Sequence, residues 1–192
     1  MTRAGSLRLA AVIYGAGFQI DDFFTRLANR LRADHVSLDG VLQENAPGTA
    51  GLCSAMTVVD LASQSRFLIS QDLGSQAKGC RLDSRGLAEI GAVLDQKPIH
   101  ELELFILNKF GKAEADGGGL RPALARAIEA GIPVLTAVRA PYTEAWLQFH
   151  ERLAVDLPPD RDAVLAWCRE SVQALRAARR IDPHRITEDV EL

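Results

Sequence analysis

Four side chains that can bind or activate charged groups lie close together in the middle of the chain. They are Asn108, Lys109, Lys112 and Glu114, and they follow an apolar run at residues 102–107. Such a run is typical of a strand that is buried on both faces of a parallel sheet. In open α/β sheets, ligands bind at the carboxyl ends of the strands. These four residues are therefore the first candidates for a functional site.

The chemistry that these residue types favour is anion binding. The ammonium groups of Lys109 and Lys112, near a glycine turn at Gly111, can neutralise phosphate or another oxyanion. Glu114 can orient water or a metal ion, and the three glycines at 117–119 allow backbone amides to approach an anion. The alternative interpretation is a charged loop that is simply solvated.

The elements on both sides of this segment indicate a strand–loop–helix–strand unit. A helix is expected from Leu120, because Pro122 suits a first helical turn and Gly131 suits the C-cap. Ile132 to Val138 is then the next strand. Such a unit predicts a parallel sheet with helices packed on it.

A second candidate site lies near the N-terminus. An apolar run at residues 9–14 predicts the first strand, and Gly15, Ala16 and Gly17 follow it. A helix is expected at 20–31, where apolar residues recur with a 3.6-residue period. This order of strand, glycine turn and helix is the general form that holds phosphate groups.

The specific phosphate-binding fingerprints are absent from this turn. A Walker loop needs Gly-Lys-Ser/Thr at the start of the helix, and Ile20 stands where the third glycine of a dinucleotide motif belongs. Two interpretations remain open: a tight structural turn, and a turn that contacts an anion or a nucleotide.

The polar stretch at residues 70–83 has no hydrophobic periodicity and is expected to form a loop. It is either a functional lid or a simple connection. Lys78 and Arg81 within it are further candidate anion ligands. Cys80 is a candidate soft metal or redox ligand, which favours a regulatory interaction protein as one alternative function.

The bulk properties exclude several classes of protein. A net charge of −3 with a pI near 5.8 argues against a nucleic-acid partner, and no apolar run is long enough for membrane insertion. The N-terminal apolar run, roughly seven residues, suits a buried strand better than a signal peptide. Three widely spaced cysteines predict neither a disulfide framework nor a zinc knuckle. We expect a cytoplasmic protein with a single α/β domain at 1–180 and a polar tail at 181–192.

The rest of the chain completes an α/β three-layer sandwich with a mostly parallel sheet and a β-hairpin insertion. The remaining expected elements are strands at 36–42 and 153–157, a hairpin of 56–61 with 66–69, and helices at 84–94, 142–149 and 163–178.

The segment NKFGKAEADGGG at 108–119, followed by GIPVLTAV, resembles a bacterial family of uncharacterised domains that carry NKFGKxEA and then GIPVLTAV. Some members of that family are encoded beside molybdate-transport genes. The segment is also similar to Asp-Glu-Ile-Gly-Lys-Met-Glu of the P-loop nucleoside triphosphatases first described from thermophiles. The likeness extends from Leu9 to about Phe149.

The resemblance to these triphosphatases implies a P-loop fold and a phosphate-binding site. Gly111, Lys112 and Glu114 match the triphosphatase pattern. Asn108 and Lys109 fall where that family has its Walker B aspartate and catalytic glutamate. The glycine turn takes the Walker A position without its lysine and hydroxyl, which in an active enzyme hold the phosphates and Mg²⁺.

The leading hypothesis is a protein that binds a small anionic ligand, either nucleotide phosphate or an oxyanion such as molybdate, through residues 15–17, Lys109 and Lys112. One alternative is an unconventional phosphohydrolase in which Glu114 is the base and Asp72 or Asp83 holds a metal; only this alternative needs Mg²⁺. The other is a regulatory protein that acts as a homo-oligomer or with a metal-cofactor assembly partner.

Overall fold

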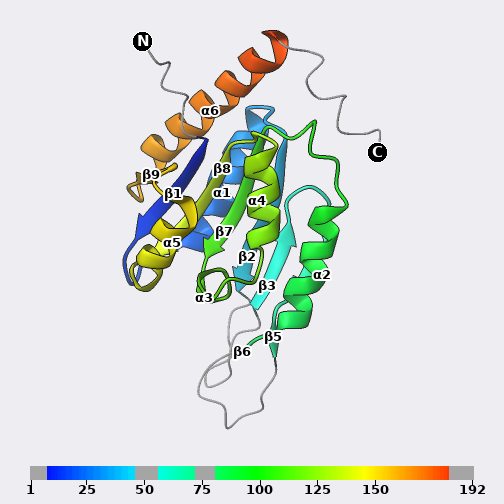
Figure 1. The fold of residues 1–192 in the computed structure, drawn as a ribbon, viewed down its shortest axis with the longest axis vertical. Helices are drawn as coiled ribbons and strands as arrows, with labels where there is room; N and C mark the ends of the chain where they lie inside the picture. The colour runs from blue at the N-terminus through cyan, green and yellow to red at the C-terminus, as the bar shows by residue number, and fades with distance from the viewer. Residues whose placement is uncertain (1–7, 46–55, 72–80, 182–192) are drawn as a thin grey trace.

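The computed structural model describes residues 8–45, 56–71 and 81–181 (Figure 1). Seven strands form one sheet in the order β4-β3-β2-β7-β8-β1-β9. The pairs β2–β3 and β3–β4 are antiparallel, and the other four pairs are parallel. The strands are β1 (Leu9–Tyr14), β2 (Leu38–Asn45), β3 (Met56–Asp60), β4 (Arg66–Leu68), β7 (Leu104–Phe110), β8 (Val134–Arg139) and β9 (Ala154–Leu157).

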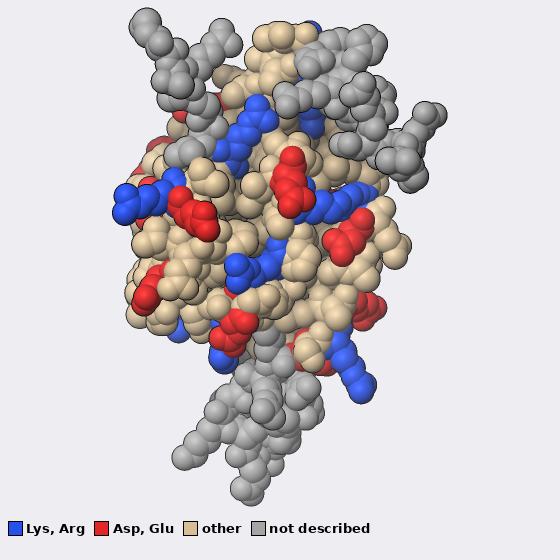
Figure 2. Space-filling view, viewed as in Figure 1, with Lys and Arg blue, Asp and Glu red and all other residues tan. Residues whose placement is uncertain are grey.

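Helices cover both faces of this sheet. One face packs against α2 (Ser84–Asp95), α4 (Arg121–Glu129) and α5 (Thr143–His150), and the other packs against α1 (Ile20–Ala33) and α6 (Arg161–Ile181). The face that is turned to the viewer in Figure 2 mixes basic and acidic side chains without separating them. The predicted three-layer α/β sandwich with a mostly parallel sheet and a hairpin of β3 and β4 is confirmed.

The parallel strands place several chain segments at one edge of the sheet. The carboxyl ends of β1, β7 and β8 meet there, and both α1 and α6 begin there because each follows a strand that ends at this edge. A small ladder of β5 (Ser70–Gln71) and β6 (Arg81–Leu82) lies at the same end of the molecule (Figure 1). Within the described ranges, no helix is both long and apolar enough to cross a membrane.

Strand β7 continues further than the apolar run predicts, so that Asn108 and Lys109 lie within it. Leu107 pairs with Thr136 and Phe110 with Val138, which leaves Asn108 and Lys109 opposite the single residue Ala137. This is a β-bulge, and it shifts the alternation of side chains by one position. Phe110 therefore returns to the core and packs on Trp146, with ring centroids 5.3 Å apart.

A short helix, α3 (Lys112–Ala115), replaces the loop that the sequence predicts after β7. Gly111 takes the N-cap position, and Oε2 of Glu114 accepts a hydrogen bond from its amide at 3.0 Å. The helix ends at Ala115, and Asp116 is its C-cap before the three glycines. The sequence contains this capping pair, but one turn of helix is too short to produce a detectable hydrophobic period.

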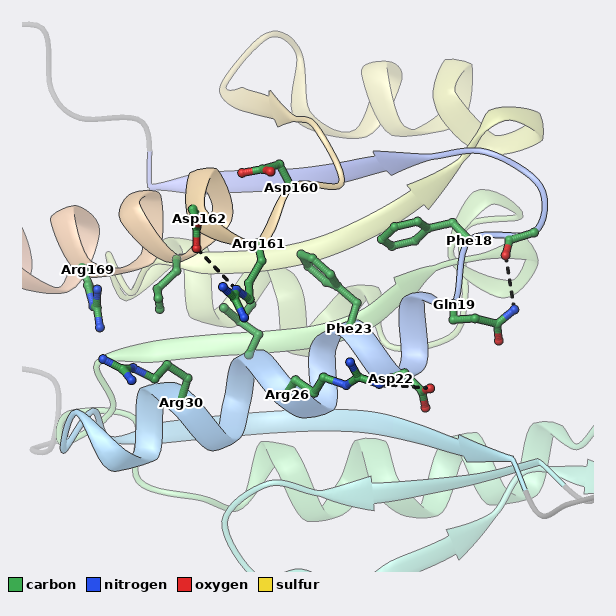
Figure 3. A pocket seen from close by; sticks show the side chains of 13 residues that line it. Phe18, Gln19, Asp22, Phe23, Arg26, Arg30, Asp160, Arg161, Asp162 and Arg169 are labelled. Carbon is green, nitrogen blue, oxygen red and sulfur yellow. Dashed lines mark hydrogen bonds and ion pairs between the residues drawn. The ribbon is translucent and has the colours of Figure 1, made fainter.

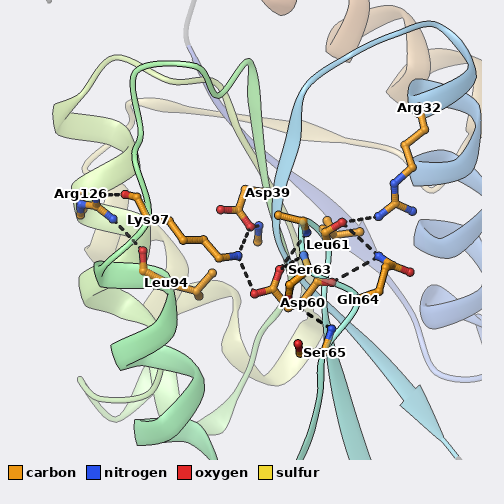
Figure 4. A network of polar contacts seen from close by, with 12 residues as sticks. Arg32, Asp39, Asp60, Leu61, Ser63, Gln64, Ser65, Leu94, Lys97 and Arg126 are labelled. Atoms are coloured by element: carbon orange, nitrogen blue, oxygen red, sulfur yellow. Dashed lines mark hydrogen bonds and ion pairs between the residues drawn. The ribbon is translucent and has the colours of Figure 1, made fainter.

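The amino-terminal half of β2 is fixed by a close approach and by a partly buried ionic network (Figure 4). Gly40 has φ +113°, and a Cβ atom there would lie 2.1 Å from the carbonyl oxygen of Ile106. Nζ of Lys97 lies 2.6 Å from Oδ1 of Asp39 and 2.6 Å from Oδ2 of Asp60, which is fully buried. Lys97 follows α2, so the network ties the end of that helix to β2 and β3.

Hydrogen bonding determines the charge state of Asp60. Burial is the largest effect on its pKa and raises it, but the hydrogen bond from Lys97 and those from the amides of Ser63 and Ala62 together lower the pKa below its ordinary value. The carboxylate is therefore ionised in the folded protein at neutral pH, and it belongs to the scaffold.

Candidate functional site

A small pocket lies at the glycine turn between β1 and α1. Its volume is about 170 Å³. Three neighbouring strands of the sheet end at it, β7, β8 and β1. It is lined by Tyr14, Gly15, Ala16, Gly17, Phe18, Gln19, Ile20, Asp21, Lys109 and Arg139. Gly17 has φ +84°, which favours glycine at this position of the turn.

Asp21 and Lys109 form an ion pair in the wall of this pocket. Nζ of Lys109 lies 2.8 Å from Oδ1 and 3.0 Å from Oδ2 of Asp21, and 3.2 Å from Oε1 of Gln43. Nδ2 of Asn108 donates to Oδ1 of Asp21 at 2.5 Å. Because of the bulge, two consecutive residues of β7 reach the same carboxylate in the first turn of α1.

Arg139 is the second basic side chain of the pocket, and it was not among the residues predicted from the sequence. It is the last residue of β8, is exposed, and lies beside Tyr14 in the ladder between β8 and β1. It forms no ion pair with any other residue that the structure describes. The rule that ligands bind at the carboxyl ends of strands applies to Arg139 as well as to Lys109, but the predicted strand ended one residue too early.

Tyr14 presents a protonated phenol near this arginine. Burial is the main cause that raises the pKa of Tyr14, and the negative charge of Asp21 raises it further. The hydroxyl is therefore able to donate a hydrogen bond at any physiological pH.

Lys112 and Glu114 do not join Lys109 at the pocket. Nζ of Lys112 pairs with Asp116 at 2.7 Å, and its side chain is 75% exposed. Glu114 is only 6% exposed, and its two oxygens accept hydrogen bonds from the amides of Gly111 and Leu120 at 3.0 and 2.9 Å. The expected convergence of the two lysines is therefore not found, and the contacts of Glu114 connect α3 to the start of α4.

The remaining candidates contribute little to the described geometry. Lys78, Cys80 and Asp72 lie outside the described residues, and Arg81 is described only by its backbone pairing with Gln71 in the β5–β6 ladder. Asp83 caps α2 by accepting from the amide of Arg85 at 3.0 Å. In the described parts of the chain, no three His, Cys, Asp or Glu side chains group into a candidate metal site.

A larger groove of about 1000 Å³ lies between α1 and the start of α6 (Figure 3). Phe18 and Phe23 face it with ring centroids 5.5 Å apart, and Arg26, Arg30, Arg161 and Arg169 also line it. Each of these arginines forms an ion pair with an aspartate. The nitrogen–oxygen distances are 4.0 Å for Arg26–Asp22, 3.5 Å for Arg30–Asp34, 3.4 Å for Arg161–Asp162 and 2.5 Å for Arg169–Asp34. The groove shares Gly17, Phe18 and Gln19 with the small pocket.

The sequence over most of this scaffold matches a known family. The family model described as "Protein of unknown function (DUF2478)" matches residues 9–167, which include the glycine turn and the whole seven-stranded sheet. The chain belongs to the DUF2478 family.

Two other proteins are similar to this chain, one in sequence and one in structure. The Molybdenum import ATP-binding protein ModC 2 of Bradyrhizobium diazoefficiens is 35% identical over 172 residues, which are 90% of this chain and 19% of that protein. The chain thus spans about a fifth of the length of that relative. A human cancer-related nucleoside triphosphatase, known from a solution structure, superposes with a TM-score of 0.59 at 15% identity over 88% of this chain and 99% of that one. This likeness confirms a fold of P-loop triphosphatase type.

Proposed function

We propose that this DUF2478 protein binds a small oxyanion at the glycine turn and does not hydrolyse nucleoside triphosphates. The observation that carries the proposal is the pocket of about 170 Å³ lined by Lys109 and Arg139. Pockets for drug-sized ligands have about 300 to 1,000 Å³. The volume therefore suits a tetrahedral oxyanion better than a whole nucleotide.

The backbone at this pocket supports anion binding. Gln19 is the N-cap residue of α1, but its side chain makes no cap and instead donates to the carbonyl of Gly17 at 3.2 Å. The amide of Ile20 donates to the carbonyl of Phe18 at 3.0 Å. The next amides in the first turn of a helix have no partner within the helix, and they attract anions when no side chain caps them. The Arg139 guanidinium adds a fork of donors that matches two oxygens of one oxyanion.

The sequence around the pocket supports binding without hydrolysis, because it has no Gly-Lys-Ser/Thr at the start of α1. The first turn of α1 has Ile20, Asp21 and Asp22 where a P-loop enzyme has its lysine and hydroxyl. On β7, Asn108 and Lys109 take the place of the acidic residues. Each lost electrostatic contact costs on the order of several kcal/mol in the transition state, so their combined loss argues against phosphoryl transfer.

The similar proteins guide the choice of ions to test. The name of ModC 2 refers to molybdenum import, so molybdate belongs in that panel together with phosphate and sulfate. A link to molybdenum metabolism is a separate proposal, which the titration with molybdate tests.

A nucleotide is the second candidate ligand. The groove between α1 and α6 shares Gly17, Phe18 and Gln19 with the pocket, so one molecule with its phosphate at the turn can extend over Phe18 and Phe23. The P-loop type of fold agrees with this arrangement.

Isothermal titration of the purified chain tests the proposal. Molybdate, phosphate, sulfate and ATP with Mg²⁺ are titrated separately, and phosphate release from ATP is followed in parallel. We expect binding of at least one inorganic oxyanion and no phosphate release. Arg139→Ala should weaken binding about tenfold or more, because it removes charge-assisted hydrogen bonds of about 1.5–3 kcal/mol.

Lys112→Ala is the matched control, since it removes a cation of the neighbouring segment that does not line the pocket. Its affinity should equal that of the wild type. Absence of binding for every inorganic ion, or an equal loss in Lys112→Ala and Arg139→Ala, would overturn the proposal. Tight binding of ATP alone would favour the nucleotide instead.

A further inference from the structure

We infer that Asp21 makes this pocket selective for oxyanions with a single negative charge over oxyanions with two. The inference rests on the oxyanion site proposed above and names the class of ion that it accepts. From the sequence alone, Asp21 is expected only in the first turn of a helix, where its negative charge suits the helix dipole.

Among the residues that the structure describes, the charges that line the pocket add up to a single positive charge. Lys109 and Arg139 contribute two cations and Asp21 contributes one anion. Asp21 already pairs with Lys109 at 2.8 Å, so Arg139 is the excess cation. A singly charged ion balances this excess, whereas a doubly charged ion leaves one negative charge uncompensated.

The Asp21 carboxylate is held in the pocket wall, and moving it away would cost free energy. Its Oδ1 accepts from Nδ2 of Asn108 at 2.5 Å, and Asn108 is only 3% exposed. If Asp21 turned away to make room for a dianion, the amide of Asn108 would lose its acceptor in a buried position. A buried donor without an acceptor is costly, so the negative charge stays where it is.

An ion in so small a pocket lies within a few ångströms of Asp21. Screening by salt acts over about 8–10 Å, so it does not weaken this repulsion. A carboxylate accepts hydrogen bonds and donates none, and it therefore meets the hydroxyl of a protonated oxyanion more favourably than it meets a fully deprotonated one.

Inorganic phosphate, sulfate and molybdate are the probes that test this selectivity. Phosphate changes from mostly singly to mostly doubly charged between about pH 6 and pH 8, while sulfate and molybdate carry two charges throughout. For the wild type, we expect phosphate to bind severalfold more tightly at the lower pH and to bind more tightly there than sulfate or molybdate.

Asp21→Asn should raise the affinity for sulfate and molybdate at least tenfold and should abolish the preference for phosphate at low pH. Asp22→Asn is the matched control. It removes the same charge from the next residue, which does not line the pocket and pairs only with Arg26 at 4.0 Å among the described residues. Its affinities should remain those of the wild type.

Lys109→Met distinguishes two explanations for a change in selectivity: loss of the Asp21 charge, and loosening of the pocket when the ion pair is broken. It breaks the same ion pair but keeps the negative charge of Asp21. It should weaken all ions while keeping the preference for the singly charged form. A shift toward dianions in Lys109→Met as large as in Asp21→Asn would overturn the inference, as would an unchanged ratio of sulfate to phosphate affinity in Asp21→Asn. If no ion binds to the wild type, the proposed function itself fails.

Discussion

Asp21 in α1 and Lys109 in β7 form an ion pair at 2.8 Å, although the two residues are 88 positions apart in the chain. The helix that follows the glycine turn supplies the negative charge, and the neighbouring strand supplies the positive charge. In a P-loop that hydrolyses nucleotides, the lysine stands at the start of the helix and the aspartate stands on the strand. The signs are therefore reversed here, and the ion pair neutralises itself before any ligand arrives.

Glu114→Gln should destabilise the protein rather than remove a catalytic base. The carboxylate accepts from the amides of Gly111 and Leu120 and is buried, so the substitution weakens two charge-assisted hydrogen bonds. We expect the free energy of unfolding in urea to fall by about 1.5–3 kcal/mol. The exposed Glu129→Gln is the control and should change it by less than about 0.5 kcal/mol. Mg²⁺-dependent phosphate release that Glu114→Gln abolishes without loss of stability would contradict this structural role.

Two glycine-to-alanine substitutions should act in opposite directions. At Gly40, the new Cβ would lie 2.1 Å from the carbonyl oxygen of Ile106 at φ +113°, so β2 and β7 cannot stay paired as they are. We expect a loss of about 3 kcal/mol or more in the free energy of unfolding. At Gly91 in α2, the nearest atom is Cδ2 of Leu120 at 3.7 Å, an ordinary contact. Gly91→Ala should therefore stabilise the helix by about 0.5–1 kcal/mol, and thermal unfolding of both variants checks the pair.

The partly buried network of Lys97, Asp39 and Asp60 should make the free energy of unfolding decrease at acidic pH. The pKa of Asp60 is lower in the folded chain than in the unfolded one. The stability that it contributes is thus present above the unfolded pKa of about 4 and is lost as the pH falls through the folded pKa. Urea unfolding across a pH series should show a decrease in acid for the wild type and a shallower decrease for Asp60→Asn. The exposed Asp95→Asn should keep the wild-type slope.

Breaking the same network from the other side should cost more. Lys97→Met leaves the fully buried Asp60 carboxylate without its cation. Removing one partner of a buried pair typically destabilises a protein by about 3–5 kcal/mol. Adding Asp60→Asn to Lys97→Met should restore part of the loss in urea unfolding; a double variant that is no more stable than the single one would show that the charge is not the cause.

Cys168 should be inert toward alkylating reagents in the folded protein. It lies fully buried in α6, and burial raises the pKa of its thiol to about 12. Because the thiolate is the reactive form, iodoacetamide at mildly alkaline pH should leave the peptide that contains Cys168 unmodified. The same peptide should be labelled in urea. Labelling at equal rates in both conditions would mean that α6 does not pack as described.

Much of this fold was predictable because the apolar runs are long and uninterrupted. The segments that became β1, β7 and β8 are buried on both faces, and such strands give the strongest signal in a single sequence. The hairpin of β3 and β4 was also correctly predicted. The bulge in β7 was not, because the contacts of its residues are tertiary: Asn108 donates to Asp21, which is 87 positions away in the chain.

The candidate site was predictable only in part for the same reason. The strand-end rule pointed to Lys109, and the structure places Lys109 and the glycine turn in the lining of one pocket. It also predicted Lys112, but one turn of helix stabilised by Glu114 places Lys112 beside Asp116 instead. The partners of ionic side chains are set by tertiary packing, and the sequence alone carries no signal for them.

The contact between Asn108 and Asp21 also limits how this chain can change. Asn108→Asp, the single step that would restore a metal-binding acid on β7, would put two carboxylate oxygens where an amide and a carboxylate now meet at 2.5 Å. One of the two acids would then have to hold a proton, or the loop would have to move. If the chain binds without hydrolysing, as proposed, a gain of hydrolysis would therefore need simultaneous changes on α1 and β7. We therefore expect substitutions at positions 21 and 108 to be strongly epistatic, because neither side chain can change its charge without affecting the other.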